Sequence, residues 1–158
     1  MVGTGTGIAP FMSMIRQLDH DALMGRTHQV RYTLIYADRT LRQLAYHAEL
    51  VDIEAAKRLD FVYIPSVSRP TAADGADARL GRGRANNLLR HVFGMPLMVD
   101  AVGHAVGPAL PAHVRRNRLS ERFDKAKTVI LTCGNPASVE DIRLVADAQR
   151  IRIETEDW

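Results

Sequence analysis

The fold of this chain is decided by two segments, Gly3-Thr4-Gly5-Thr6-Gly7-Ile8-Ala9-Pro10 near its start and Cys133-Gly134-Asn135-Pro136 near its end. Each has the pattern of a strand that ends, turns on glycine and continues into a helix. Parallel strands end at the same edge of a sheet, and dinucleotides bind at that edge. The two segments therefore predict one shared site. The first turn would meet a pyrophosphate there, and the second would place a thiol beside a redox-active ring.

The first turn alternates glycine with threonine from Gly3 to Gly7. Glycine allows the backbone to approach a ligand closely and to adopt positive φ angles. The helix expected to begin near Ala9 offers unpaired N–H groups and the positive end of its dipole, and both attract phosphate. Ile8 stands at the third glycine position of the usual G-x-G-x-x-G fingerprint. A plain tight turn would use the same residues, so this segment alone leaves nucleotide binding open.

The second turn carries the single cysteine of the chain, Cys133, directly after the apolar run Val129–Leu131. A free cysteine is often simply a small buried hydrophobe, and that alternative stays open for Cys133. The six histidines show no ligand spacing, so we predict no metal site. The sequence also lacks the Gly-x-Ser-x-Gly elbow of a hydrolase.

Strand and helix patterns alternate along the whole chain. Apolar residues at steps of three and four predict helices over 8–18, 41–57, 84–92 and 139–149, and branched apolar runs predict strands over 30–36, 61–66, 128–132 and 151–155. Loops are expected over 69–82 and 95–113, which leaves only Met1 and Val2 for the first strand. The alternation predicts an α/β fold, with a parallel sheet between helices and right-handed crossovers. We expect a three-layer α/β/α sandwich whose five-stranded parallel sheet has the order 3-2-1-4-5.

The composition fits one domain over residues 1–158. A hydrophobic fraction of 46% and a charged fraction of 25% are ordinary for a soluble globular protein. No apolar run approaches the ~20 residues that span a membrane, so we expect no membrane partner. A net charge of +3 with 6% aromatic residues argues against nucleic-acid binding. A single cysteine allows no internal disulfide, which favours a cytoplasmic location.

Taken together, these segments resemble the C-terminal NADP-binding domain of the ferredoxin/flavodoxin–NADP reductase family, in its bacterial type. The matching segments, in chain order, are Val2–Phe11, Ile35–Arg39, Leu44–Tyr46, Glu49–Leu50, Ser66–Arg69, Gly81–Arg82, Cys133–Pro136 and Trp158. The resemblance implies the NADP(H)-binding half of a flavin-dependent reductase, which passes hydride between NADPH and FAD and serves ferredoxin or flavodoxin. The protein around such cofactors supplies orientation and electrostatics.

The resemblance also implies roles for individual residues. The pyrophosphate and the nicotinamide ribose would lie against Gly3, Thr4, Gly5, Thr6, Gly7, Ile8, Ala9 and Pro10. Ser68 and Arg69 would take the adenosine 2′-phosphate, with Arg82 as a second cation, because the guanidinium fork grips phosphate oxygens in pairs. A solvated loop is the plainer explanation of these arginines.

At the other end of the site, the resemblance places Cys133 against the nicotinamide, with Gly134, Asn135 and Pro136 in the same turn. Cys133 would position the hydride donor and would not act as a nucleophile. Trp158 matches the terminal aromatic residue that stacks on the flavin, although a frayed tail would look the same. The family usually carries a functional carboxylate near its end. Glu156 and Glu154 both qualify by position, and the choice between them stays open.

Three features depart from the family pattern. Pro70 stands where the family often has glutamate, and the stretch 94–113 has no recognised counterpart. The FAD-binding barrel domain should precede Met1. We therefore expect an N-terminally truncated chain that is inactive as a reductase without an FAD-binding domain as its partner.

Other functions share the same motifs. The electron-supplying reductase of an oxygenase would have both turns but would prefer NADH. A non-catalytic nucleotide-binding or interaction module would use the basic segment 115–118 to dock an acidic protein, although a solvated charged helix explains that segment equally. An unstable fragment with a clipped central strand is a further alternative.

Overall fold

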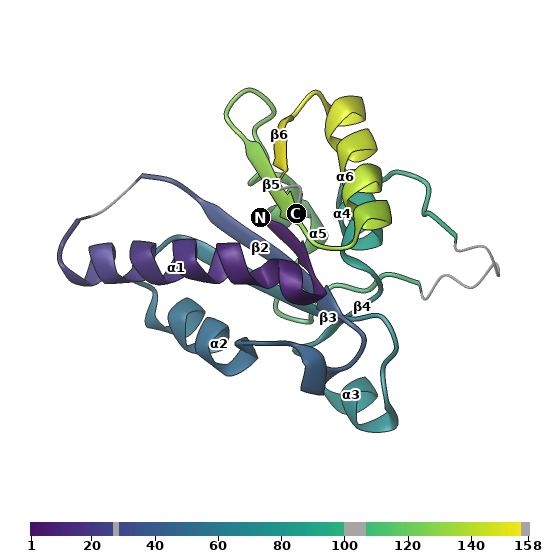
Figure 1. Cartoon of the computed structure of the whole chain (residues 1–158), viewed down its shortest axis with the longest axis horizontal. Helices are drawn as coiled ribbons and strands as arrows, with labels where there is room; N and C mark the ends of the chain where they lie inside the picture. Colours follow the sequence, from purple (N-terminus) through teal and green to yellow (C-terminus); the bar gives the residue numbers. More distant parts are fainter. Residues whose placement is uncertain (27–28, 100–106, 156–158) are drawn as a thin grey trace.

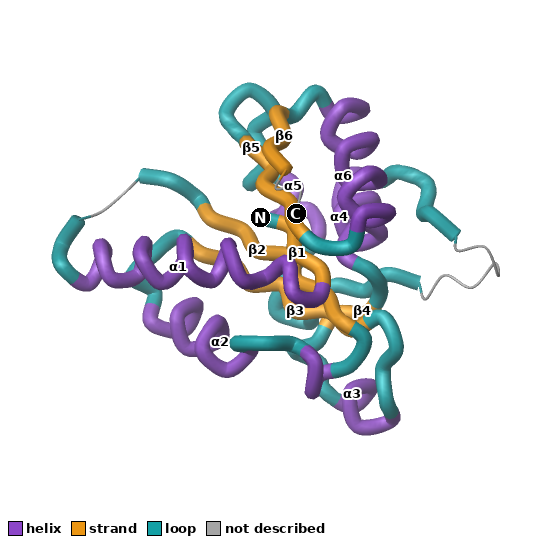
Figure 2. Tube along the Cα trace, viewed as in Figure 1, coloured by secondary structure: helices purple, strands orange, loops and turns teal. Residues whose placement is uncertain are grey.

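The structure is a computed structural model that describes residues 1–26, 29–99 and 107–155. Its centre is a parallel sheet of six strands in the order β4-β3-β2-β1-β5-β6, drawn in orange in Figure 2. The strands are β1 (Val2–Thr4), β2 (Tyr32–Asp38), β3 (Phe61–Val67), β4 (Gly81–Arg82), β5 (Val129–Cys133) and β6 (Arg152–Thr155). The predicted α/β class with a parallel sheet between helices is confirmed.

Helices cover both faces of this sheet (Figure 1). The helices are α1 (Ile8–Leu23), α2 (His47–Ala56), α3 (Ala72–Ala76), α4 (Ala85–Phe93), α5 (Arg116–Ser120) and α6 (Pro136–Gln149), with 3-10 turns η1 (Gly5–Gly7) and η2 (Leu41–Gln43). Helices α1 and α2 pack on one face, and α4, α5 and α6 pack on the other. No helix in the described ranges is long and apolar enough to cross a membrane.

The alternation of side chains along β2 divides the core in two. Leu34 and Tyr36 pack with α1 and α2, whereas Ile35 and Ala37 pack with α4 and α6. This division follows from the two-residue period of a strand, and all four residues are buried because both faces are covered. The short apolar runs in the sequence are therefore central strands of a doubly covered sheet.

The five-strand prediction needs a correction, because the sheet has an additional edge strand, β4, inside the predicted 69–82 loop. The order of the other five strands is the predicted 3-2-1-4-5. Strand β4 pairs with the end of β3, and Arg82 forms two backbone hydrogen bonds with Ala109, at 2.8 and 3.0 Å. A strand of two residues has no alternation to detect, and its partner lies far away in the sequence.

Two other elements also differ from the sequence-based expectation. The predicted 41–57 helix is a 3-10 turn followed by α2, because Tyr46 adopts a left-handed φ of 59° just before His47. Within the predicted 69–82 loop, Thr71 and Asp74 form a reciprocal capping box that starts α3.

The central strand β1 has only three residues, yet it is bonded on both sides. Val2 lies opposite Ile35 of β2 and opposite Thr132 of β5. The Thr132 hydroxyl also donates a hydrogen bond to the carbonyl oxygen of Val2, at 3.0 Å. The strand delivers the first glycine turn to the carboxyl edge of the sheet.

Candidate functional site

The two glycine turns meet at the carboxyl edge of the sheet. Gly3 lies directly opposite Cys133 in the parallel pairing of β1 with β5. Just beyond the strands, the backbone N–H of Asn135 donates a hydrogen bond to the Thr4 hydroxyl, at 2.8 Å. Segments 130 residues apart in the sequence are thus held together by direct contact, as the sequence predicted.

Two of the glycines are required by this contact between the turns. A Cβ atom at Gly7 would overlap the Cys133 carbonyl oxygen and would lie 2.6 Å from the backbone nitrogen of Gly134. A Cβ at Gly134 would lie 2.5 Å from the carbonyl oxygen of Thr4, and Gly134 has a φ of 132°, which side-chain-bearing residues rarely adopt. The glycines at these positions therefore serve the packing of one turn on the other.

Gly5 is different, because its environment is open. It has a φ of 55°, and a Cβ placed there would meet nothing within 4 Å. Gly5 nevertheless lines the cavity at the edge of the sheet. A glycine whose missing side chain leaves open space over a cavity is suited to a ligand that approaches the backbone closely. This observation favours nucleotide binding over a plain tight turn.

A cavity of about 930 Å³ lies above these turns, which is large enough for a cofactor. Its wall from the first turn and α1 comprises Thr4, Gly5, Thr6, Gly7, Ala9 and Pro10, and its wall from the second turn and α6 comprises Cys133, Gly134, Asn135 and Ser138. The ends of β2 and β3 contribute Ala37, Asp38, Arg39, Ser68 and Arg69. The start of α4 contributes Arg84, Ala85 and Asn87, and the segment after α4 contributes Met98.

The electrostatics of the cavity favour an anion. The first turns of α1 and α6 both lie at its wall, and neither contains an acidic residue. Pro136 begins α6, where the missing N–H costs nothing, and the Asn135 side chain accepts a hydrogen bond from Ser138 N at 3.2 Å. Two helix N-termini and three arginines at one cavity attract phosphate groups.

Several predicted residues support the site without lining the cavity. Ile8 is buried in the core below the first turn, and Gly3 faces the Phe11 ring, which a Cβ would approach to 3.3 Å. Pro136 supports the start of α6. The remaining residues of the two predicted turns line the cavity, and so do Ser68 and Arg69.

The expected second cation, Arg82, lies outside the cavity wall, so the cavity gives its predicted role no support. Its side chain donates a hydrogen bond to the carbonyl oxygen of Gly75, at 3.0 Å, and it is not part of the cavity wall. Arg39 and Arg84 line the cavity instead. The sequence repeats Gly-Arg at 81–82 and 83–84, and the path of the chain into α4 brings the second arginine, not the first, to the cavity wall.

The predicted C-terminal residues give no further support to the site. Glu156 and Trp158 lie outside the described residues. Glu154 lies on the edge strand β6, where its carboxylate accepts a hydrogen bond from Arg152 Nε at 3.0 Å. Sequence reasoning missed the cavity-wall residues Ala37, Asp38, Arg39, Arg84, Ala85, Asn87, Met98 and Ser138. The position of Asp38 and Arg39 at the end of a predicted strand was the one signal that could have found any of these residues.

Cys133 is not part of a disulfide, and only 2% of the residue is exposed. Buried thiols react slowly, because a reagent reaches them only when the structure opens. We expect a chromogenic disulfide reagent to modify the native protein on the order of 100-fold more slowly than the protein in denaturing urea. The measurement is the rate at which the reagent releases its coloured thiolate under both conditions. Equal rates would show that Cys133 is accessible and would argue against this packing.

Comparison with protein families identifies the domain. The model of the oxidoreductase NAD-binding domain matches residues 1–95. The chain belongs to this family. The match contains the first glycine turn, Asp38, Arg39, Ser68 and Arg69, and it ends just after α4.

Comparison with solved structures shows the same fold over the whole domain. The structure of the CS-b5R domains of human Ncb5or, in its NAD⁺ form, covers 98% of this chain with a TM-score of 0.60 at 14% sequence identity. The match covers 35% of that chain, so the NAD-binding domain spans about a third of its length. A comparison with curated proteins found no match.

Proposed function

We propose that this NAD-binding domain binds NADP(H) and presents its nicotinamide to FAD held by a partner domain, as in the ferredoxin/flavodoxin–NADP reductases. The observation that carries the proposal is the pair of interlocked glycine turns at the mouth of one anion-attracting cavity. The open space over Gly5 and the arginines of the wall fit a dinucleotide. The bound nicotinamide supplies the hydride chemistry, and ferredoxin or flavodoxin would be the electron carrier.

The residues of the chain bind and orient the dinucleotide from two ends. The turn from Gly3 to Pro10 and the N-terminus of α1 would hold the pyrophosphate. Ser68 and Arg69 follow β3, and the backbone N–H of Arg69 donates to the carbonyl oxygen of Arg39, at 2.8 Å. This bond extends the pairing of β2 with β3 and brings two arginines to one corner of the cavity, where the 2′-phosphate would bind. Cys133 lies under the opposite corner.

Replacing Arg69 by alanine tests the NADP(H) assignment. Loss of a charge-assisted contact of about 1.5–3 kcal/mol should weaken binding of 2′-phospho-AMP roughly 10- to 100-fold and leave AMP binding nearly unchanged. Isothermal titration calorimetry with both nucleotides measures the difference. Arg118→Ala is the matched control, because that arginine is 79% exposed on α5, away from the cavity. Equal affinity of the unmodified domain for the two nucleotides would reject a preference for NADP(H).

Asp38 favours a second candidate, the NADH-dependent reductase of an oxygenase. Its carboxylate belongs to the cavity wall beside Arg39 and accepts the Arg39 backbone N–H at 2.7 Å. A carboxylate at this edge can accept hydrogen bonds from a ribose and repels a phosphate on the same ribose. In this case AMP would bind at least as well as 2′-phospho-AMP.

The alternative of an interaction module has little structural support. The basic segment is part of α5, which contributes Leu119 to the core, and the Arg116 guanidinium donates to the carbonyl oxygen of Val92 at 3.4 Å. These residues pack α5 on α4, so the Arg116 guanidinium is bonded within the domain and is less available to a partner protein.

A further inference from the structure

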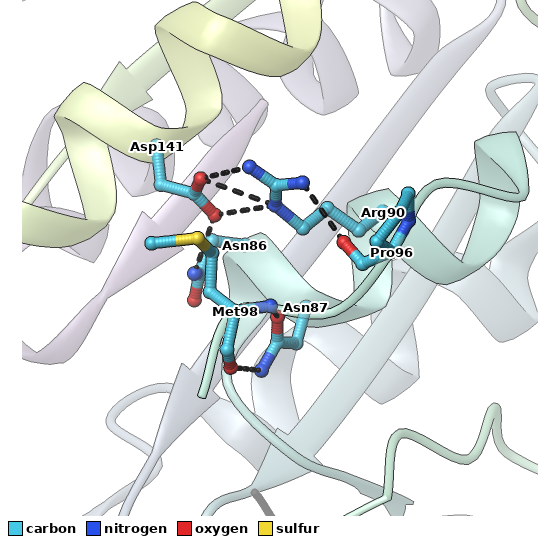
Figure 3. Close-up of polar contacts among 6 residues, drawn as sticks. All are labelled: Asn86, Asn87, Arg90, Pro96, Met98 and Asp141. Carbon is cyan, nitrogen blue, oxygen red and sulfur yellow. Dashed lines mark hydrogen bonds and ion pairs between the residues drawn. The ribbon is translucent and has the colours of Figure 1, made fainter. Parts of the chain in front are cut away.

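One residue of the cavity wall, Met98, belongs to a segment that follows α4 and lies just beyond the residues matched by the family model. Helix α4 ends at Gly94, which has a left-handed φ of 69° and turns the chain. Residues Pro96 and Met98 of the following segment lie beside α4 (Figure 3). Met98 lines the cavity, together with Asn87 from the first turn of α4.

The Asn87 side chain holds the backbone of Met98 with both of its polar atoms. Its amide nitrogen donates to the Met98 carbonyl oxygen at 2.8 Å, and its carbonyl oxygen accepts from the Met98 backbone N–H at 2.9 Å (Figure 3). Asn87 is 3% exposed. A reciprocal pair of buried hydrogen bonds fixes the position of a backbone unit much as a strand partner would.

A second buried side chain of α4, Arg90, bonds the same segment and also the Asp141 carboxylate of α6, so the segment is linked to α6 through Arg90. Arg90 donates from Nη1 to the Pro96 carbonyl oxygen at 2.8 Å and from Nε to the Asp141 carboxylate at 2.9 Å. Asn86 donates to the same carboxylate at 2.7 Å. Burial raises the pKa of Asp141, but the hydrogen bonds from Arg90 and Asn86 outweigh it and hold the pKa below its ordinary value. The segment is thereby tied to two helices.

The buried hydrogen bonds of Asn87 and Arg90 fix a segment that carries an exposed apolar side chain, Met98. Met98 is 46% exposed, although Asn87 bonds both its backbone N–H and its carbonyl oxygen. Among the described residues of the cavity wall, Met98 is the one large apolar side chain; the others are polar or small. A dinucleotide brings two planar rings into such a cavity, and ligand sites usually offer apolar surface to rings.

We propose that Met98 is a binding residue for the dinucleotide, with its thioether packed on a planar heteroaromatic ring, and that Asn87 is the residue that positions it. Thioethers make favourable contacts with aromatic rings, and their flexible chain adapts to the ring plane. The inference rests on the proposed function, because it requires a bound dinucleotide. Adenine and nicotinamide share the necessary chemistry, and binding of the two half-ligands distinguishes them.

The test compares NADPH dissociation constants of the unmodified domain, Met98→Ala, Met98→Leu and Asn87→Ala. We expect Met98→Ala to weaken binding about 5- to 10-fold. Met98→Leu should recover most of the affinity, and Asn87→Ala should weaken binding because Met98 loses its anchor. Leu97→Ala is the matched control, since Leu97 is 38% exposed on the same segment but does not line the cavity. Thermal unfolding should show the same midpoint for Met98→Ala as for the unmodified domain.

The half-ligands then locate the ring. A loss confined to AMP places Met98 on adenine, and a loss confined to nicotinamide mononucleotide places it on the nicotinamide. Unchanged NADPH, AMP and mononucleotide affinities in Met98→Ala would overturn this inference while leaving the proposed function intact. Failure of the unmodified domain to bind NADPH or NADH would instead reject the proposed function.

Discussion

Replacing Gly7 by alanine should destabilise the domain by about 3 kcal/mol or more and abolish nucleotide binding. The added Cβ would overlap the Cys133 carbonyl oxygen and lie 2.6 Å from the Gly134 backbone nitrogen. These atoms belong to backbone that ends a central strand, so they cannot move aside as a flexible side chain would. Relief requires the two turns to separate, which breaks the mouth of the cavity. Urea denaturation monitored by circular dichroism measures the loss.

Gly107→Ala provides the matched control for this substitution. A Cβ at Gly107 meets nothing within 4 Å, and its backbone does not require glycine. We expect Gly107→Ala to unfold within about 0.5 kcal/mol of the unmodified domain. A Gly7→Ala variant with an unchanged urea midpoint would show that the turns are not in contact in solution. The prediction that the two turns form one shared site would then be wrong.

Replacing Arg90 by alanine should cost about 3–5 kcal/mol of folding free energy, because it leaves the Asp141 carboxylate buried without its charged partner. Arg90 and Asp141 form a buried ion pair between α4 and α6, with side chains 10% and 4% exposed. The double variant Arg90→Met with Asp141→Leu should recover much of the loss, since it leaves no unpaired buried charge. Chemical denaturation of the single and double variants measures both effects.

Arg58→Ala is the control for an exposed ion pair. Arg58 and Asp19 lie 2.6 Å apart, but their side chains are 36% and 17% exposed, so the change should cost at most about 1 kcal/mol. An equal loss of folding free energy in Arg58→Ala and Arg90→Ala would contradict the expectation that breaking the buried ion pair destabilises the domain more.

The same ion pair predicts a pH dependence. The pKa of Asp141 is lower in the folded domain than in the unfolded chain. Its stabilising contribution is therefore present above the unfolded pKa and is lost as the pH falls through the folded pKa. The stability difference between the unmodified domain and Arg90→Ala should be largest near neutral pH and should shrink below about pH 4.

The local elements of the fold were predictable because their signals are contained in neighbouring residues. Helix α1 buries Ile8, Phe11 and Ile15 on one stripe, and β3 is a strand of seven residues that is apolar except for Ser66 and the Tyr63 hydroxyl. The boundaries of β2 and β5 shifted by one or two residues from the prediction. Right-handed connections between parallel strands limit the possible strand orders, and a doubly wound sheet places its first strand at the centre. These features need no knowledge of which distant side chains meet.

The sequence predicted the part of the candidate site that the two glycine turns form. It missed the residues that reach the cavity only through contacts between distant segments. Arg82 and Arg84 look equivalent in the sequence, yet one binds Gly75 O and the other lines the cavity. Strand β4 exists through its pairing with β3 and Ala109. Asn87 and Met98 form part of the cavity because α4 ends at Gly94 and the chain folds back.

The sequence by itself predicts a parallel α/β sheet with two glycine turns at one of its edges. It does so because residue periodicity and turn chemistry are properties of neighbouring residues. The tertiary structure alone decided which arginines reach the cavity, which glycines serve the packing of the two turns, which glycine faces the open cavity, and how an exposed methionine joins the cavity wall. The reason is physical. A side chain's direction depends on the atoms that surround it, and here those atoms come from segments far away along the chain.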